Sequence, residues 1–98
     1  MTSPINPEDA LRDVLSDIAR RYGTPVYAYD LDRLRRQVDR LRTALPAAVE
    51  VLYSFKANAS LGICDVFADA GLGADVASAG ELATAIEAGF RASSTFVA

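Results

Sequence analysis

Apolar residues recur at intervals of three and four in two N-terminal stretches of the chain, which predicts two amphipathic helices. The first is expected from about Pro7, with acids in its first turn, to Gly23. The second is expected over residues 31–45, with Asp30 as its N-cap and Pro46 ending it. Its polar face carries several arginines, which we interpret as a solvated surface with ion pairs.

Four other stretches have the composition of β-strands. Residues 25–29 alternate valine and alanine with tyrosines, which predicts a short strand. Residues 49–55 form a nearly unbroken apolar run, which is typical of a parallel strand covered on both faces. Shorter strands are predicted over residues 74–77 and 95–98.

Two further helices are predicted between these later strands. One follows Ser60 and closes at Gly71, and the other follows Ser78 and closes at Gly89. Ser78 and Glu81 form the S-x-x-E pattern of a capping box, which accounts for both residues structurally. The inward-facing residues are expected to be Ile63, Val66, Phe67 and Ala70 in the first helix and Leu82, Ala85 and Ile86 in the second.

The alternation of strands and helices predicts the α/β class, with a parallel open sheet or a barrel. A complete parallel barrel takes about 250 residues, whereas the chain has 98 residues. If the fold is a barrel, we therefore expect this chain to be the N-terminal part of a (β/α)8 TIM-type barrel, incomplete here. Residues 30–98 would carry its first strands and helices, and residues 1–29 an N-terminal helix and strand. An unrelated flavodoxin-like domain, complete at this length, is the alternative.

Composition excludes several classes of function. The net charge is −3 and no block of basic residues stands apart from helical spacing, so nucleic acid is not an expected partner. No apolar run approaches the roughly 18 residues of a membrane span. A single cysteine and the lack of a signal peptide favour the cytoplasm. Because histidine is absent, a Ser-His triad or a metal site within this chain is not expected.

Lys56 is the candidate catalytic residue, because it is the only lysine and arginine supplies every other basic side chain. It directly follows a predicted strand, and parallel α/β proteins place functional groups at the carboxyl ends of strands. Partial burial at such a position favours the neutral amine, which is the form that attacks a carbonyl carbon. A lysine that reaches from a strand end to solvent is the structural alternative.

Asp75 is the second candidate, because it lies in the next predicted strand. If the two strands are parallel neighbours, its carboxylate approaches the same end as Lys56 and could hold that amine or a substrate ammonium. A plain strand-end aspartate is the alternative. Cys64 falls beside apolar positions of a predicted helix, so we interpret it as a buried thiol and not as a nucleophile.

Three segments of the chain resemble, in order and spacing, the fold type III pyridoxal-phosphate decarboxylases that act on diaminopimelate, ornithine and arginine. They are Tyr-Gly-Thr-Pro-Val-Tyr-Ala-Tyr-Asp at residues 22–30, Tyr-Ser-Phe-Lys-Ala-Asn at residues 53–58, and Gly-Ala-Asp-Val-Ala-Ser-Ala-Gly-Glu-Leu at residues 73–82. These enzymes have an alanine-racemase-like barrel. The resemblance implies an amino-acid decarboxylase, a carbon-carbon lyase, whose cofactor is pyridoxal 5′-phosphate.

By the same resemblance, Lys56 would be the Schiff-base lysine that binds the cofactor, releases it to the substrate and later transfers a proton. Asp75 matches the acidic residue that such enzymes place near this lysine. The partner would be a small amino acid, and the full-length protein would be a cytoplasmic homodimer. The phosphate site, the group stacked on the ring and the acid on the pyridine nitrogen are expected after Ala98, so these residues alone should be inactive.

Two other functions within the same fold remain as alternatives. Amino-acid racemases are similar around the lysine, but they usually continue with Tyr-Gly-His, whereas this chain has Ala59, Ser60 and Leu61 after Asn58. A non-catalytic regulatory homologue would not need to keep Lys56. Phe55 stands where many relatives carry a smaller aliphatic residue, so the resemblance does not by itself name diaminopimelate as the substrate.

Overall fold

The structure is a computed structural model that describes residues 6–98. The part of the predicted N-terminal segment before residue 6 lies outside the described residues. The regular elements, in chain order, are α1 (Pro7–Tyr22), α2 (Leu31–Ala44), β1 (Leu52–Ser54), α3 (Leu61–Asp69), β2 (Gly73–Val76), α4 (Ala79–Ala88), the 3-10 turn η1 (Ala92–Ser94) and β3 (Thr95–Val97).

Both N-terminal helices form where the apolar spacing predicts them. The Asn6 side chain caps α1 by accepting a hydrogen bond from the Glu8 N–H at 2.9 Å. Gly23, with φ of +79°, ends α1 in a conformation that favours glycine. Asp30 caps α2 by accepting from the Arg33 N–H at 3.1 Å. Local capping chemistry therefore fixes the ends of these helices.

The predicted strand over residues 25–29 is wrong. This segment is extended but pairs with no strand among the described residues, and Tyr27 is 90% exposed. The residue types favour a strand, but a strand also requires a neighbour that satisfies its backbone groups. For the same reason the apolar run at residues 49–55 forms a strand only over Leu52–Ser54, which is the part that pairs with β2.

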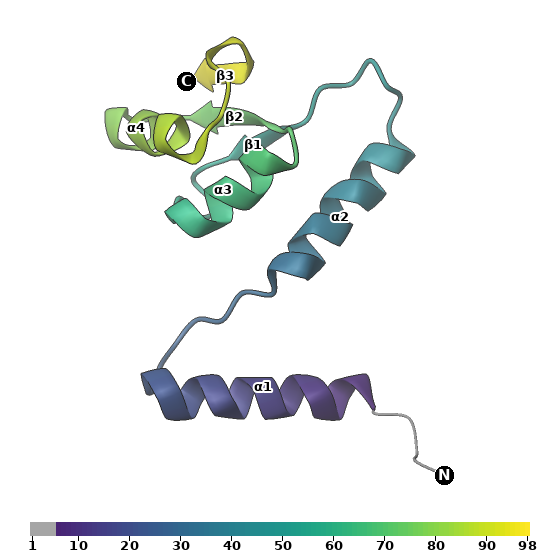
Figure 1. Cartoon of the computed structure of the whole chain (residues 1–98). Helices are drawn as coiled ribbons and strands as arrows, with labels where there is room; N and C mark the ends of the chain where they lie inside the picture. The colour runs from purple at the N-terminus through teal and green to yellow at the C-terminus, as the bar shows by residue number, and fades with distance from the viewer. Residues whose placement is uncertain (1–5) are drawn as a thin grey trace.

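The three strands form one parallel sheet in the order β1-β2-β3 (Figure 1). Ser54 is in register with Asp75, and Asp75 with Phe96. A flavodoxin-like sheet would place its first strand between the second and third. The sequential order contradicts that alternative and agrees with the start of a barrel.

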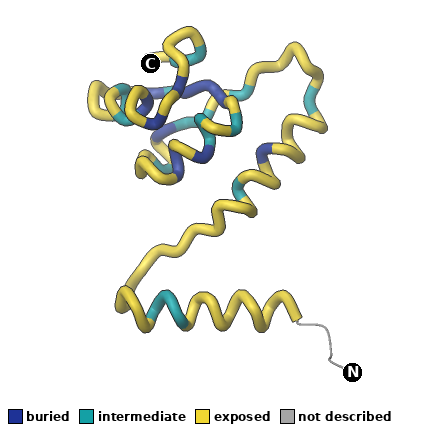
Figure 2. Tube along the Cα trace, in the orientation of Figure 1, coloured by how far each residue is buried: buried dark blue, intermediate teal, exposed yellow. Residues whose placement is uncertain are grey.

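Helices α3 and α4 cover one face of this sheet and bury its core (Figures 1 and 2). The core cluster is Phe55, Cys64, Ala74, Val76, Ala85, Ala88 and Phe90. Phe55 and Phe90 meet edge to face, with their ring centroids 5.4 Å apart. Ile86, which we expected to face inward, is 69% exposed. In α4, Ala85 and Ala88 face the sheet, so Ile86 lies on the outer surface.

The other face of the sheet has no helix over it among residues 6–98. Successive side chains of a strand point to opposite faces. Because Ala74 and Val76 are in the helix-covered core, Asp75 between them points to the uncovered face. In a barrel, this uncovered face is the interior and the helix-covered face is the outside.

Helix α2 packs on α3, whereas α1 lies apart from the sheet and has no buried residue (Figures 1 and 2). On α2, Val38 is buried and the Arg42 guanidinium donates a hydrogen bond to the Ala70 carbonyl. The Cα radius of gyration is 16.8 Å, against about 13 Å for a compact domain of this length. No helix within residues 6–98 is long and apolar enough to cross a membrane.

Gly73 is required by the close approach of β1 and the segment before β3. A Cβ at this position would clash with the Leu52 side chain and lie 2.5 Å from the Ser94 carbonyl oxygen, which is backbone and cannot turn away. We therefore predict that Gly73→Ala lowers the free energy of unfolding of the full-length protein by about 1–3 kcal/mol.

Gly62→Ala is the matched control for urea unfolding, because a Cβ there meets nothing within 4 Å and the site is inside α3. Gly62→Ala should either leave the free energy of unfolding unchanged or increase it, by at least about 0.5 kcal/mol. Equal stability of the two variants would contradict the close approach at Gly73.

Candidate active site

Lys56 lies in a tight turn directly after β1, at the carboxyl end of the sheet. The turn is held on both sides of the lysine. The Phe55 N–H donates to the Asp75 carbonyl at 3.0 Å and the Ala57 N–H donates to the Ser54 carbonyl at 3.2 Å. The Lys56 side chain is exposed and, within residues 6–98, forms no hydrogen bond or ion pair. The partial burial that we expected for this amine is therefore not provided by the described residues.

Asp75 lies at the same end of the sheet as Lys56. It is on the neighbouring strand β2, paired in register with Ser54, two residues before the lysine. Its side chain is half-buried on the uncovered face, and it forms no ion pair with Lys56 among the described residues. The predicted arrangement of parallel neighbouring strands is thus correct, and it brings both residues to the same end of the sheet.

Asn58 connects the turn after β1 to three other parts of the chain, which the sequence alone did not indicate. Its backbone carbonyl accepts from the Tyr53 hydroxyl at 2.6 Å, and its side-chain Oδ1 accepts from the Ser60 N–H at 2.9 Å. Its Nδ2 donates to the Tyr29 hydroxyl at 2.8 Å. The Ser60 bond is an Asx-turn, a local signal that an asparagine in a loop can give. The bonds with Tyr29 and Tyr53 depend on the fold.

Ser78 and Glu81 cap α4, as the S-x-x-E pattern predicts. The Ser78 hydroxyl accepts from the Glu81 N–H at 3.1 Å. Glu81 Oε1 accepts from the N–H of Ala77 at 2.8 Å, one residue before the N-cap that a standard capping box would use. Both side chains are therefore engaged in holding the start of this helix.

The buried Cys64 thiol and the half-buried Tyr53 hydroxyl lie near the Lys56 turn, on the side of Asn58. Burial raises the pKa of the Cys64 thiol, and the negative charge of Glu81 raises it further. Burial also raises the pKa of the Tyr53 hydroxyl, with a further increase from Cys64. At neutral pH both groups are therefore protonated. This agrees with the interpretation of Cys64 as a structural thiol, since the thiolate is the nucleophilic form.

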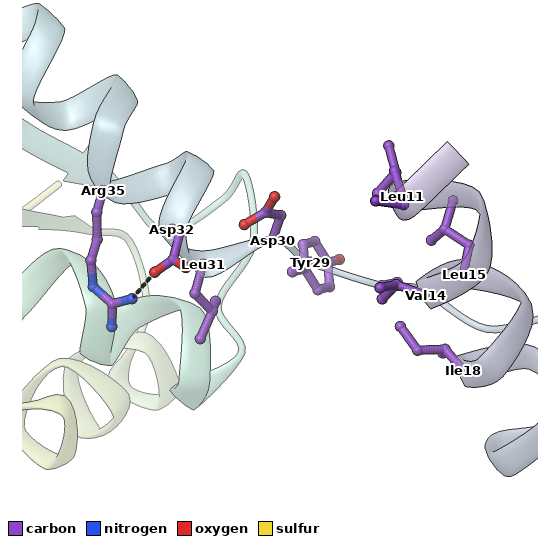
Figure 3. Close-up of a pocket in the computed structure, with 11 residues that line it drawn as sticks. Leu11, Val14, Leu15, Ile18, Tyr29, Asp30, Leu31, Asp32 and Arg35 are labelled. Atoms are coloured by element: carbon purple, nitrogen blue, oxygen red, sulfur yellow. Dashed lines mark hydrogen bonds and ion pairs between the residues drawn. The ribbon is translucent and has the colours of Figure 1, made fainter. Parts of the chain in front are cut away.

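A wide groove lies elsewhere, between α1 and the start of α2 (Figure 3). It has a volume of about 670 Å³ and is lined by apolar side chains of α1, including Leu11, Val14 and Leu15. Tyr29 lines it as well, but neither Lys56 nor Asp75 does. The groove is open and mostly apolar, and neither candidate residue lines it, so we place the candidate site at the strand ends.

A sequence model of the pyridoxal-dependent decarboxylase family, specifically of its pyridoxal binding domain, matches residues 31–98. This chain belongs to that family. The sequential parallel sheet with Lys56 at its carboxyl end is accordingly the N-terminal part of the family's (β/α)8 barrel, and the family's cofactor is pyridoxal 5′-phosphate.

Curated relatives and solved structures agree with this assignment. The chain is 44% identical over 79 residues to diaminopimelate decarboxylase of Zymomonas mobilis, covering 76% of the chain and 19% of that protein. It is 40% identical over 78 residues to L-glutamyl-[BtrI acyl-carrier protein] decarboxylase of Niallia circulans, covering 80% of the chain and 18% of that protein.

The structure of diaminopimelate decarboxylase from Helicobacter pylori, complexed with L-lysine, aligns with a TM-score of 0.73 at 28% identity, covering 85% of this chain and 21% of that chain. A crystal structure of a protein from Aquifex aeolicus aligns with a TM-score of 0.78 at 30% identity, covering 85% of this chain and 21% of that chain. The chain thus spans about a fifth of the length of the relatives that it matches.

The residues of the site fit a covalently bound pyridoxal cofactor. The Lys56 amine is exposed and unpaired among the described residues, so it is free to form a bond with an aldehyde carbon. The uncovered face of the sheet beside it carries the Asp75 carboxylate. No acidic side chain among the described residues forms an ion pair with this amine.

We predict that alkylation of Cys64 at neutral pH is more than about ten-fold slower in the folded full-length protein than in urea. A raised pKa lowers the thiolate fraction at a given pH, and burial also restricts access to the sulfur. Iodoacetamide labelling, followed by mass spectrometry of the peptide that contains Cys64, measures the two rates. Equal rates would contradict the buried position in the core.

Proposed function

We propose that the full-length protein is a pyridoxal-phosphate-dependent amino-acid decarboxylase in which Lys56 is the covalent anchor of the cofactor. The observation that carries the proposal is the position of the chain's only lysine. It is exposed, held in a fixed turn, and lies at the carboxyl end of the first strand of the family's pyridoxal binding domain. Carboxyl ends of barrel strands are where such folds carry their active sites.

The residues of this chain would bind, orient and move a proton. When bound, the cofactor supplies an electron sink for the carbanion that remains after carbon dioxide leaves. Lys56 Nζ would hold the cofactor, and the same amine, once released by the substrate, would be placed to carry a proton. Asp75 would hold the positive charge of Lys56 or of the substrate ammonium from the neighbouring strand.

The substrate class is an amino acid, with diaminopimelate as the first candidate to test. This choice is supported by the names of relatives from several bacteria, which are diaminopimelate decarboxylases. The Niallia circulans relative acts on a carrier-bound glutamyl group, so related chains accept other substrates. The curated relatives named above are decarboxylases and not racemases. The cytoplasmic homodimer expected from the resemblance remains a prediction.

Borohydride reduction of the full-length protein loaded with pyridoxal 5′-phosphate tests the role of Lys56. We expect a pyridoxyl group on the peptide that contains Lys56, because reduction makes the bond between amine and cofactor permanent. Lys56→Ala should lose this label and reduce carbon dioxide release from diaminopimelate, or from the preferred amino acid of a panel, to background.

Lys56→Arg is the matched variant, because it keeps the positive charge but cannot form the bond at neutral pH. It should be as inactive as Lys56→Ala while keeping the wild-type melting temperature. A wild-type protein that decarboxylates amino acids but is labelled at another lysine would contradict the proposal.

Asp75→Asn should lower kcat/KM for decarboxylation by roughly 100-fold, the size typical for loss of one charged or proton-transferring group in an active site. The amide keeps the shape of the side chain but removes its charge. Asp65→Asn is the control, because Asp65 is exposed on the outer surface of α3. Steady-state kinetics on both variants would contradict the role of Asp75 if their kcat/KM values were equal.

A further inference from the structure

Asn58 is the most connected residue of the turn that carries Lys56. Its carbonyl oxygen, its Oδ1 and its Nδ2 are all engaged, with Tyr53, Ser60 and Tyr29 respectively. A turn at a strand end would otherwise be held only by local bonds. These contacts fix the position of a residue that lies two places after the lysine, and so they restrict the path of the chain on the far side of Lys56.

Tyr53 connects Asn58 to the packed core of the sheet. Its ring stacks on that of Phe67 with the ring centroids 4.1 Å apart, and it lies tilted against Phe55 with the ring centroids 5.6 Å apart. Its hydroxyl reaches from the core to the Asn58 carbonyl at 2.6 Å. Because burial raises the pKa of this hydroxyl, it keeps its proton and donates at neutral pH. The core of the sheet thus holds one end of the turn.

Tyr29 provides the other side, and it comes from outside the matched family domain. The family model begins at residue 31, whereas Tyr29 lies in the extended segment between α1 and α2. Its hydroxyl accepts from Asn58 Nδ2 at 2.8 Å across 29 residues of chain. The segment forms no strand, so this bond is a specific tie between it and the turn of Lys56.

We propose that Tyr29 and Tyr53 are positioning residues that clamp Asn58 from two sides and so hold the Lys56 turn ready for the cofactor. The proposal rests on Lys56 being the cofactor anchor. Without the clamp, the turn would sample more conformations and would have to be ordered when the cofactor binds. That ordering reduces affinity, which is the general effect of losing preorganisation.

The alternative is that the Tyr29 hydroxyl bond is merely structural. The two possibilities differ in what they change. A positioning bond alters the affinity for the cofactor in a protein whose fold is intact, whereas a structural bond alters the melting temperature of the apoprotein. Tyr27 is a matched reference, because it belongs to the same segment, has the same side chain and is 90% exposed.

The experiment compares Tyr29→Phe with Tyr27→Phe in the full-length protein. Apoprotein is titrated with pyridoxal 5′-phosphate, and the absorbance of the bound cofactor gives the Kd. We expect Tyr29→Phe to raise the Kd about 3- to 10-fold, the effect of one net hydrogen bond. Tyr27→Phe should leave the Kd unchanged, and the apoprotein melting temperatures should agree. Equal Kd values for the two variants, or a lower melting temperature alone, overturn the proposal.

A double-mutant cycle shows whether the effect passes through Asn58. In Asn58→Ser the hydroxyl can still accept from the Ser60 N–H, but the donor to Tyr29 is lost. In that background Tyr29→Phe should change the Kd less than two-fold, because its partner is already absent. If Tyr29→Phe raises the Kd as much in the Asn58→Ser background as in the wild type, the proposal is overturned. The same comparison decides the outcome in which Tyr29→Phe changes both the Kd and the melting temperature.

Borohydride labelling of the wild-type protein separates this proposal from the proposed function. If the wild-type peptide containing Lys56 carries no pyridoxyl group, the function itself fails. If it is labelled and the tyrosine variants behave alike, only the clamp on Asn58 fails.

Discussion

The parallel pairing of β1 with β2 is the interaction on which the rest of the structure depends. It sets Ser54 beside Asp75 and lets the Phe55 N–H continue the ladder to the Asp75 carbonyl at 3.0 Å. Parallel strands end at the same edge, so Lys56, which follows β1, and Asp75 on β2 both lie at that edge. The same pairing directs the side chains of Phe55 and Val76 toward the helices. The register of the two strands therefore sets both the core on one face of the sheet and the candidate site on the other.

The site is built on this sheet by two kinds of contact. Local contacts, the tight turn at Ala57 and the Asx-turn of Asn58, shape the loop. Long-range contacts from Tyr53 and Tyr29 tie the loop to the core and to the segment before the family domain. The Lys56 side chain itself remains unpaired among residues 6–98, so the structure fixes the backbone around the amine and leaves the amine free. That division suits a residue whose bond is made to a cofactor.

The exposed apolar surface of α1 contrasts with the packed core around α3 and α4. Leu11, Val14 and Leu15 are about half exposed, whereas Phe55, Cys64 and Val76 are almost fully buried. The capping contacts of α1 at Asn6 and Gly23 are local, and none of its residues is buried among the described residues. Such a face is typical of a surface that packs against other protein, and this chain spans only about a fifth of the length of the relatives that it matches.

The sequence alone determined the helices, the caps at Asp30 and Ser78, the α/β class and the two candidate residues, because helical periodicity and capping chemistry act within a few residues of chain. The cap expected from Ser60 is the exception, because α3 begins after this residue but the Ser60 side chain forms no capping hydrogen bond. Ser78 with Glu81 and Asp30 with the Arg33 N–H are such local interactions. Only the tertiary structure decided that residues 25–29 form no strand, that Ile86 faces outward and that Tyr29 meets Asn58. Each of these outcomes depends on which distant segment supplies a partner, and no pattern in the neighbouring residues carries that information.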